Sequence, residues 1–344
     1  MEYINEVNLN EAVVHVLDNN ADEPIYNEFM LELSDETYEF ILKHIQKCLK
    51  SEELKYAIFN DGQNSIKEFS KNYLNDKGDF LSISKKIAKQ LFVIMESHGN
   101  IPSCDLMIVS ISTEYGPILA LLKMDYVKNF THSIGSCDNK IGIDIVPQFV
   151  GLPSGGQLIQ KCAFIKQVIP ENKFDLMIID KQNRRDSEDY EINYFTSNFL
   201  GCSIIENERD ATSNFIKVAE NWTRSNLKDN AEAAEMVRTA VKKKLQEEDN
   251  IFVNRFANEV FKESKDVAEN FLQYAKERGI TENVPIDKEY VDKKLKRIRL
   301  KIDKDMDVYI DRDTYDDKSK FEVIRNGDGT INIVLKHIKN YIEK

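Results

Sequence analysis

The chain has 344 residues, of which 42% are hydrophobic and 31% are charged. This composition is that of a soluble globular protein, and the length is typical of two domains. The formal net charge of −12 excludes a uniformly basic surface, so a polyanion would have to bind through local basic patches.

The sequence predicts a cytoplasmic protein without membrane association. No apolar run approaches the roughly 20 residues that a membrane span needs. The first residues, MEYINEVNLNEAVVHV, include acids where a secretion signal carries basic residues. The cysteines are dispersed, which fits reduced thiols in a cytosol, and no cysteine or histidine pattern has metal-binding spacing. His44 and Cys48 lie four residues apart, but structural zinc usually takes four ligands. We therefore predict no metal and no cofactor.

The first quarter of the chain alternates between strand and helix patterns. Ser34 stands where a helix cap belongs, and the apolar residues after it recur at helical spacing. In chain order we expect a strand at 12–17, a helix from Ser34 to about Leu49, a strand at 56–59, and helices at 64–74 and 82–96.

The next region gives the clearest β signal. DLMIVSIS at 105–112, a turn at 115–117 and a second apolar run at 118–127 predict a hairpin. Three further strands are expected at 141–150, 161–168 and 174–181. Regular βαβ units are missing, which argues against a doubly wound nucleotide-binding fold. We expect helices packed on a mainly antiparallel sheet.

The chain is expected to turn helical from Tyr190 to Glu277. Helices are predicted at 231–247, 251–263 and 265–277, with Gly279 as a C-terminal stop. Phe252, Phe256 and Val260 repeat every four residues and are expected in the core. RSNLKDNAE at 224–232 is the predicted linker. The fold class is therefore α+β, with an α+β domain at 1–228 and a domain of helices and β-hairpins at 229–344.

A concentrated basic segment, KKLKRIRLKID, occupies 293–303. Six of the nine residues from Lys293 to Lys301 are Lys or Arg. Residues 281–344 hold 15 basic and 14 acidic residues, a net charge of +1, so the rest of the chain carries −13. The segment is either a nucleic-acid contact or a strand whose charges are neutralised by its neighbours.

Strict alternation from Arg297 onward predicts a β-hairpin with its loop at 303–305. One register satisfies both the apolar and the charge pattern, and it pairs Ile298 with Ile310, Leu300 with Val308, Ile302 with Met306, Arg297 with Asp311, Arg299 with Tyr309, and Lys301 with Asp307. Such cross-strand pairs stabilise by roughly 0.2–1 kcal/mol each. Much of the basic strand is therefore expected to be neutralised. Lys293, Lys294 and Lys296 precede the hairpin and have no such partner, so they stay available for phosphate.

A second hairpin is predicted near the C-terminus. FEVIR and TINIVL flank an NGDG turn at 326–329.

Other basic residues form three groups. Two groups lie on predicted helices, Arg238, Lys242, Lys243 and Lys244 on one and Lys85, Lys86 and Lys89 on another. The third group, Arg184 and Arg185, lies in a predicted loop. Each group is more often a solvated face than a binding site, and Lys243 and Lys244 have glutamates four residues later. Together they can still supply phosphate contacts, because that affinity is cumulative and needs no base-reading motif. No zinc-finger spacing or compact recognition helix stands out.

Two patterns leave enzymatic interpretations open. GLPSGGQL at 151–158 resembles a phosphate loop but lacks the Gly-Lys-Ser/Thr ending, so a turn is the stronger interpretation. Asp175 and Asp180 lie on one predicted strand, and a metal-dependent nuclease would need further carboxylates converging there. No Gly-x-Ser-x-Gly or His-Glu-x-x-His motif is present. We therefore predict that the protein is not an enzyme.

Several segments in order resemble a bacterial nucleoid-associated protein family, typified by NdpA (YejK). They are AVVHVLDNN (12–20), EFILKHIQKCLK (39–50), SKKIAKQLFVIM (84–95), IPSCDLMIVSI (101–111), YFTSNFLGCS (194–203) and VPIDKEYVDKKL (284–295) with the following RLKID and NGDG segments. The aromatic-rich segment ending in Phe-Leu-Gly is the most specific of them. The resemblance implies a non-enzymatic, cytoplasmic protein of the bacterial nucleoid that binds duplex DNA without strong sequence preference.

The sequence thus predicts a nucleoid-associated DNA-binding accessory protein whose partner is double-stranded DNA. The expected contact residues are Lys293, Lys294, Lys296, Arg297, Arg299, Lys242, Lys243, Lys244 and Arg238. The alternative hypothesis is an acidic interaction module that acts on a DNA-processing protein. The third hypothesis is a metal-dependent nuclease that uses Asp175 or Asp180. A homodimer is also expected, because a two-fold copy doubles a weak patch on DNA.

Overall fold

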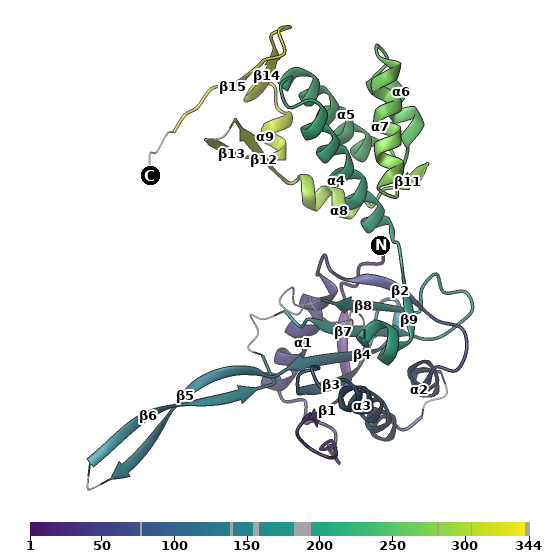
Figure 1. The fold of residues 1–344 in the computed structure, drawn as a ribbon, viewed down its shortest axis with the longest axis vertical. Helices are drawn as coiled ribbons and strands as arrows, with labels where there is room; N and C mark the ends of the chain where they lie inside the picture. Colours follow the sequence, from purple (N-terminus) through teal and green to yellow (C-terminus); the bar gives the residue numbers. More distant parts are fainter. Residues whose placement is uncertain are drawn as a thin grey trace. The chain divides into compact units, whose positions relative to one another are not determined.

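The computed structural model describes the chain except for residues 76–77, 138–139, 154–157, 182–193, 281, 304 and 341–344. The described residues form two compact units, Glu2–Ile205 and Met1 together with Glu206–Lys344 (Figure 1). They contain ten helices, one of them a π-helix, and fifteen strands. The predicted α+β fold class is confirmed.

A seven-stranded antiparallel sheet forms the centre of the unit Glu2–Ile205. Its strand order is β1-β3-β4-β7-β8-β2-β9. The strands are β1 (Val7–Leu17), β2 (Lys55–Phe59), β3 (Cys104–Thr113), β4 (Gly116–Asp125), β7 (Lys161–Lys166), β8 (Leu176–Asp180) and β9 (Cys202–Ile205). β3 and β4 are continuous apolar runs because both of their faces are covered.

Helices cover both faces of this sheet. They are α1 (Asp35–Leu49), α2 (Ser65–Leu74), α3 (Phe80–Ser97) and the π-helix η1 (Tyr194–Leu200). α2, α3 and η1 share one apolar cluster with the sheet, which includes Ala163. Cys162 points to the opposite face, because side chains alternate along a strand, and it lies beside Cys48 of α1. The predicted cap is confirmed, since the Ser34 hydroxyl accepts the Thr37 N–H that starts α1.

A long β-ribbon extends from this unit (Figure 1). It consists of β5 (Val127–Cys137) and β6 (Lys140–Val150), which form a two-stranded sheet of their own. β6 was predicted from its alternating isoleucines. β5 was not predicted as a separate strand, because its alternation is carried only by Phe130, His132 and Ile134 between polar residues and a glycine.

The unit from Glu206 onward is a helical layer with small sheets. Its elements are α4 (Glu208–Asn226), α5 (Ala231–Glu247), β10 (Asn250–Phe252), α6 (Val253–Val260), α7 (Lys265–Glu277), β11 (Asn283–Pro285), α8 (Lys288–Leu295), β12 (Arg297–Ile302), β13 (Met306–Asp311), α9 (Arg312–Asp316), β14 (Phe321–Arg325) and β15 (Ile331–Leu335). The core is aromatic: the Phe215 and Phe271 rings lie within 6 Å of Phe256. The Trp222 indole N–H donates to Asn270 at 2.8 Å.

The sequence-based helices match this unit closely, with one error. α5 and α7 have the predicted bounds, and Gly279 adopts φ 76° at the predicted stop. The prediction that Phe252 is a core residue is wrong, because it ends β10 and its side chain is 54% exposed. The helical spacing of Phe252, Phe256 and Val260 hid a three-residue strand that pairs with β11.

α4 packs in the second unit rather than on the sheet. Its apolar stripe, Phe215 to Trp222, belongs to the core shared with α5, α6 and α7. The compact units therefore divide between Ile205 and Glu206. Independent domains at 1–228 and 229–344 stay a prediction.

Candidate nucleic-acid interface

The β12–β13 hairpin contains the basic strand that the sequence singled out. Its register is the predicted one, with Ile298 opposite Ile310 and Arg299 opposite Tyr309. Ile298 and Ile310 are buried, whereas Arg297, Arg299 and Lys301 are exposed. The alternation predicted from sequence is therefore confirmed, and one face of the hairpin carries the cations to solvent.

The charges on this face are partly neutralised, although not by direct cross-strand partners. Arg299 reaches diagonally to Asp307, with Nε and NH2 hydrogen bonds of 3.0 and 3.1 Å. These hydrogen bonds raise the pKa of Arg299 and lower the pKa of Asp307. Asp307 lies directly opposite Lys301, but the bidentate geometry favours the guanidinium. Arg299 is therefore occupied within the hairpin.

Tyr309 is a feature of this face that the sequence reasoning did not count as a contact residue. Its ring is 53% exposed, and the guanidinium carbons of Arg297 and Arg299 lie 5.4 and 5.5 Å from its centroid. An exposed aromatic ring between cations is a surface on which a nucleobase or sugar can pack. The predicted register already placed Tyr309 there, so the signal was present in the sequence.

The end of α8 presents the lysines that precede the hairpin. Lys293 forms an ion pair with Glu289, one helical turn earlier, so the prediction that it has no partner is wrong. Lys294 and Lys296 are exposed, and no carboxylate among the described residues forms an ion pair with either. The spacing of Glu289 and Lys293 is the helical i,i+4 spacing that favours such pairs.

Two of the predicted cations on α5 are occupied by glutamates. Arg238 makes a bidentate contact with Glu220 of α4, with distances of 2.9 and 3.1 Å. Lys244 forms ion pairs with Glu248 at 2.6 Å and Glu259 at 2.7 Å. The hydrogen bonds to these glutamates raise the pKa of Lys244. Both side chains hold the helical layer together.

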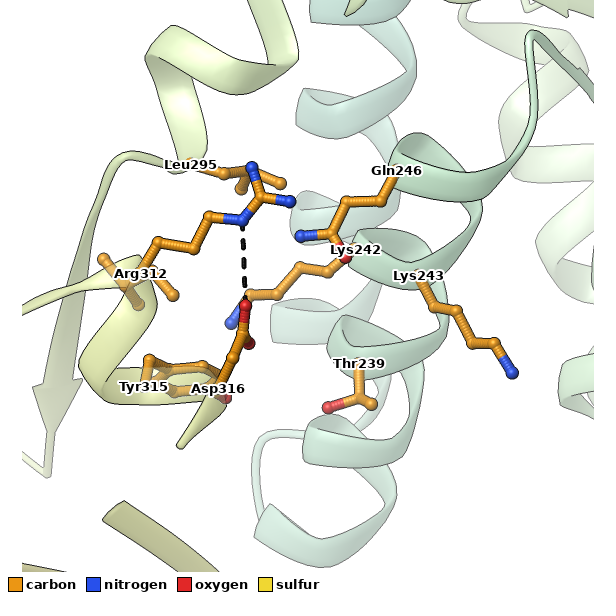
Figure 2. A pocket seen from close by; sticks show the side chains of 9 residues that line it. Thr239, Lys242, Lys243, Gln246, Leu295, Arg312, Tyr315 and Asp316 are labelled. Carbon is orange, nitrogen blue, oxygen red and sulfur yellow. Dashed lines mark ion pairs between the residues drawn. The ribbon is translucent and has the colours of Figure 1, made fainter. Parts of the chain in front are cut away.

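Lys242 is directed into a small pocket and not toward solvent (Figure 2). Its ammonium lies 4.2 Å from the centroid of the Tyr315 ring. Burial lowers the pKa of Lys242. The pocket, about 120 Å³ in volume, also contains the Arg312–Asp316 ion pair at 3.7 Å. Lys242 therefore serves packing between α5 and α9.

Lys243 differs from its neighbours on α5. Its side chain points away from the pocket in Figure 2 and is exposed. Within the described residues it has no ion pair with a carboxylate, although Glu247 lies four residues later. Leu295 and Ile298 line the same pocket as Lys243. The backbone of Lys243 therefore lies beside this pocket, but its ammonium is directed away from Leu295.

The structure thus brings part of the predicted set together. Lys294, Lys296 and Arg297 are exposed cations where α8 passes into β12, and no described carboxylate forms an ion pair with them. We call these three residues the junction cluster. Lys243 is exposed on α5, whereas Lys242, Lys244, Arg238, Lys293 and Arg299 have their charges engaged elsewhere.

The charge of the chain is unevenly divided between its two units. Residues 206–344 hold 28 basic and 29 acidic residues, whereas residues 1–205 hold 19 and 30. The net charges are −1 and −11. The junction cluster therefore lies in the unit that opposes a polyanion least.

The residues considered for catalysis are used structurally. The Asp180 carboxylate binds Lys161 and accepts from the Thr196 N–H and hydroxyl at 3.1 and 2.6 Å. Asp175 accepts the Phe59 N–H at 2.9 Å. The described residues contain no group of three His, Cys, Asp or Glu placed to hold a metal ion. The centre of the proposed phosphate loop, 154–157, and Arg184 with Arg185 lie outside the described residues.

Comparison with known proteins identifies a family for the chain. The model of a protein family described as nucleoid-associated protein YejK matches residues 13–343. No curated protein matches the chain. None of the helices in the described ranges has the length and apolarity that a membrane crossing requires.

Proposed function

The chain belongs to the nucleoid-associated protein YejK family, and from this membership we propose that it binds duplex DNA at the bacterial nucleoid. In this proposal it is a cytoplasmic accessory protein that catalyses no reaction. Binding has little sequence preference, because phosphate contacts position a protein on DNA without reading bases.

The observation that carries the proposal is the junction cluster. Lys294, Lys296 and Arg297 are exposed and without ion pairs among the described residues, in a chain that pairs most of the neighbouring cations. A cation already held by a carboxylate must break that pair before it gains a phosphate. Free cations avoid this cost, so they bind phosphate more favourably.

The size of the cluster sets the expected strength of binding. Its three cations offer about three phosphate contacts, for which affinity falls roughly 40-fold between 50 and 200 mM salt. That is a weak, strongly salt-dependent interaction. Tyr309 beside Arg297 adds a surface against which the sugar–phosphate backbone can pack without reading a base.

The test compares two triple variants in fluorescence anisotropy with labelled duplexes of unrelated sequence. Lys294→Gln, Lys296→Gln and Arg297→Gln together remove the junction cluster. The control, Lys43→Gln, Arg224→Gln and Arg255→Gln, removes three exposed cations that are already paired with glutamates four residues away. Both variants lower the net charge by three, so they differ in which cations are lost.

The cluster variant should weaken binding at least tenfold at 100 mM salt and reduce the salt slope by about 2.7, or 0.9 for each lost contact. The control should retain the wild-type slope. Equal losses in the two variants would mean that net charge, and not the cluster, governs binding. Circular dichroism spectra confirm that each variant is folded.

The acidic unit 1–205 supports a second candidate function. Its net charge of −11 suits contact with a basic surface of a DNA-processing protein. In this case the chain itself barely touches DNA. Absence of duplex binding by the wild type at 50 mM salt would refute the first proposal and favour this one.

A further inference from the structure

The β5–β6 ribbon has two chemically different faces. Cross-strand partners lie on the same face of an antiparallel pair, so the register assigns each residue to one of them. One face carries Phe130 with Pro147, Ile134 with Ile143, and Ile145 with His132. It also carries Phe149 with Lys128 and Ile141 with Ser136. The other face carries Asn129 with Gln148, Ser133 with Asp144, and Gly135 with Gly142.

The apolar face is open to solvent. Its six large hydrophobic side chains, Phe130, Ile134, Ile141, Ile143, Ile145 and Phe149, are each between 62% and 78% exposed. Together they expose about 800 Å², well above the few hundred Å² of a typical monomer patch. A two-stranded hairpin is marginally stable in water by itself. The ribbon therefore needs a partner on this face.

We propose that the apolar face of the β5–β6 ribbon is a homodimerisation surface, on which the same face of a second copy packs. The proposal gives the expected homodimer a location, and it does not depend on DNA binding. Two such sheets would stack about 10 Å apart, with the six side chains of each copy interleaved.

The area of the face fits this occupant. A stable interface buries about 800 Å² from each partner, which is close to what the six side chains expose. The face is also self-complementary, because its six large apolar side chains follow one another along its length, with Lys128, His132 and Ser136 among them, and a two-fold axis brings identical patches together. No pocket or differently shaped partner is required to cover it.

The charge of the ribbon favours a second copy over DNA. Residues 127–150 contain two Lys and two Asp, a net charge of zero. Two chains that each carry −12 repel one another, but a neutral ribbon adds nothing to that repulsion at the contact. A DNA-binding ribbon would need an excess of cations that this segment lacks.

Face packing is also favoured over edge pairing. Both edges of a two-stranded sheet are open to strand addition. Pro147 has no N–H, so it removes a donor from β6 and weakens that strand as a template. The side chains of the apolar face remain fully available.

Sedimentation equilibrium of the full chain without DNA tests the proposal. Ile141→Thr, Ile143→Thr and Ile145→Thr together keep β-branched residues and leave the charge unchanged. The matched control, Asn129→Thr, Ser133→Thr and Gln148→Thr, makes three substitutions on the opposite face. All six positions are exposed, so the sheet core is untouched.

The wild type and the control should sediment as dimers of the 39.9 kDa chain. The apolar-face variant should sediment as a monomer, with the dissociation constant raised at least about 100-fold. A wild type that is monomeric at 50 μM overturns the proposal, whether or not the ribbon binds lipid vesicles or another protein. So does an apolar-face variant that stays dimeric. The single substitution Ile145→Thr should raise the dissociation constant of the dimer by a smaller factor. Such a graded effect excludes misfolding as the cause.

Discussion

Acidification should destabilise the sheet unit through one buried histidine. His15 lies on β1 with a fully buried side chain. Its Nδ1 accepts the Asn27 N–H at 3.1 Å, so the ring proton is on Nε2 and is donated to the Ser84 hydroxyl at 2.9 Å. A proton added to Nδ1 would face the Asn27 N–H, and two donors cannot form that hydrogen bond.

The pKa of His15 gives the size of the effect. Burial, and next the charge of Lys85, lowers this pKa from 6.5 to about 4. The folded state therefore binds the proton less readily than the unfolded state does. The stability from the neutral ring is complete above pH 6.5 and is lost as the pH falls toward 4. Between pH 7 and pH 5 the free energy of unfolding should fall by about 2 kcal/mol from this group.

Urea unfolding of the wild type and His15→Gln at pH 7 and pH 5 measures this contribution. Circular dichroism follows both units, while fluorescence of Trp222, the one tryptophan in the chain, follows the second core alone, so a transition seen only by circular dichroism belongs to the sheet unit. The midpoint difference between wild type and variant should shrink by about 1 M urea at pH 5. His337→Gln removes an exposed histidine outside the β5–β6 ribbon and should show the wild-type pH dependence. A midpoint difference for His15→Gln that is the same at both pH values would refute the assigned role of this ring.

Two further outcomes follow from the second unit. Asp307→Asn should free Arg299 and steepen the salt dependence of duplex binding by about 0.9 in log–log slope, measured by anisotropy; an unchanged slope would show that Arg299 does not reach phosphate. The fragment 206–344 should fold with a buried Trp222 and a cooperative urea transition, whereas 229–344, which lacks α4 and its tryptophan, should show no cooperative transition by circular dichroism. A cooperative 229–344 fragment would instead support the boundary predicted from sequence.

The elements that sequence predicted best are those whose local signals agree. In the β12–β13 hairpin, turn length, apolar alternation and charge alternation all select one register, and every cross-strand pair follows it. α5 and α7 likewise have full helical periods and clear ends. The short strands β9 and β10 were missed, because three or four residues carry too little periodicity to distinguish a strand from a helix.

The candidate site was less predictable for a physical reason. Nearby pairs, such as Lys293 with Glu289, could be read from helical spacing. Arg238 with Glu220 could not, because the partners lie on different helices 18 residues apart and meet only through the packing of α4 on α5. Which cations remain free depends on such tertiary neighbours and on side-chain reach. The sequence therefore defined the basic segments but not the cluster within them.

Pairing, and not net charge, decides whether so acidic a chain can contact DNA. At physiological salt the Debye length is about 8 Å, so a phosphate at the junction cluster responds mainly to charges within that distance. There, Lys293 is matched by Glu289 and Arg299 by Asp307, while Asp311 lies directly opposite Arg297, so Lys294, Lys296 and Arg297 give a local surplus of about two charges. At lower salt both the attraction of phosphate to this surplus and the repulsion by the acidic residues of the chain grow, so the salt dependence of the proposed DNA contact measures the balance between them.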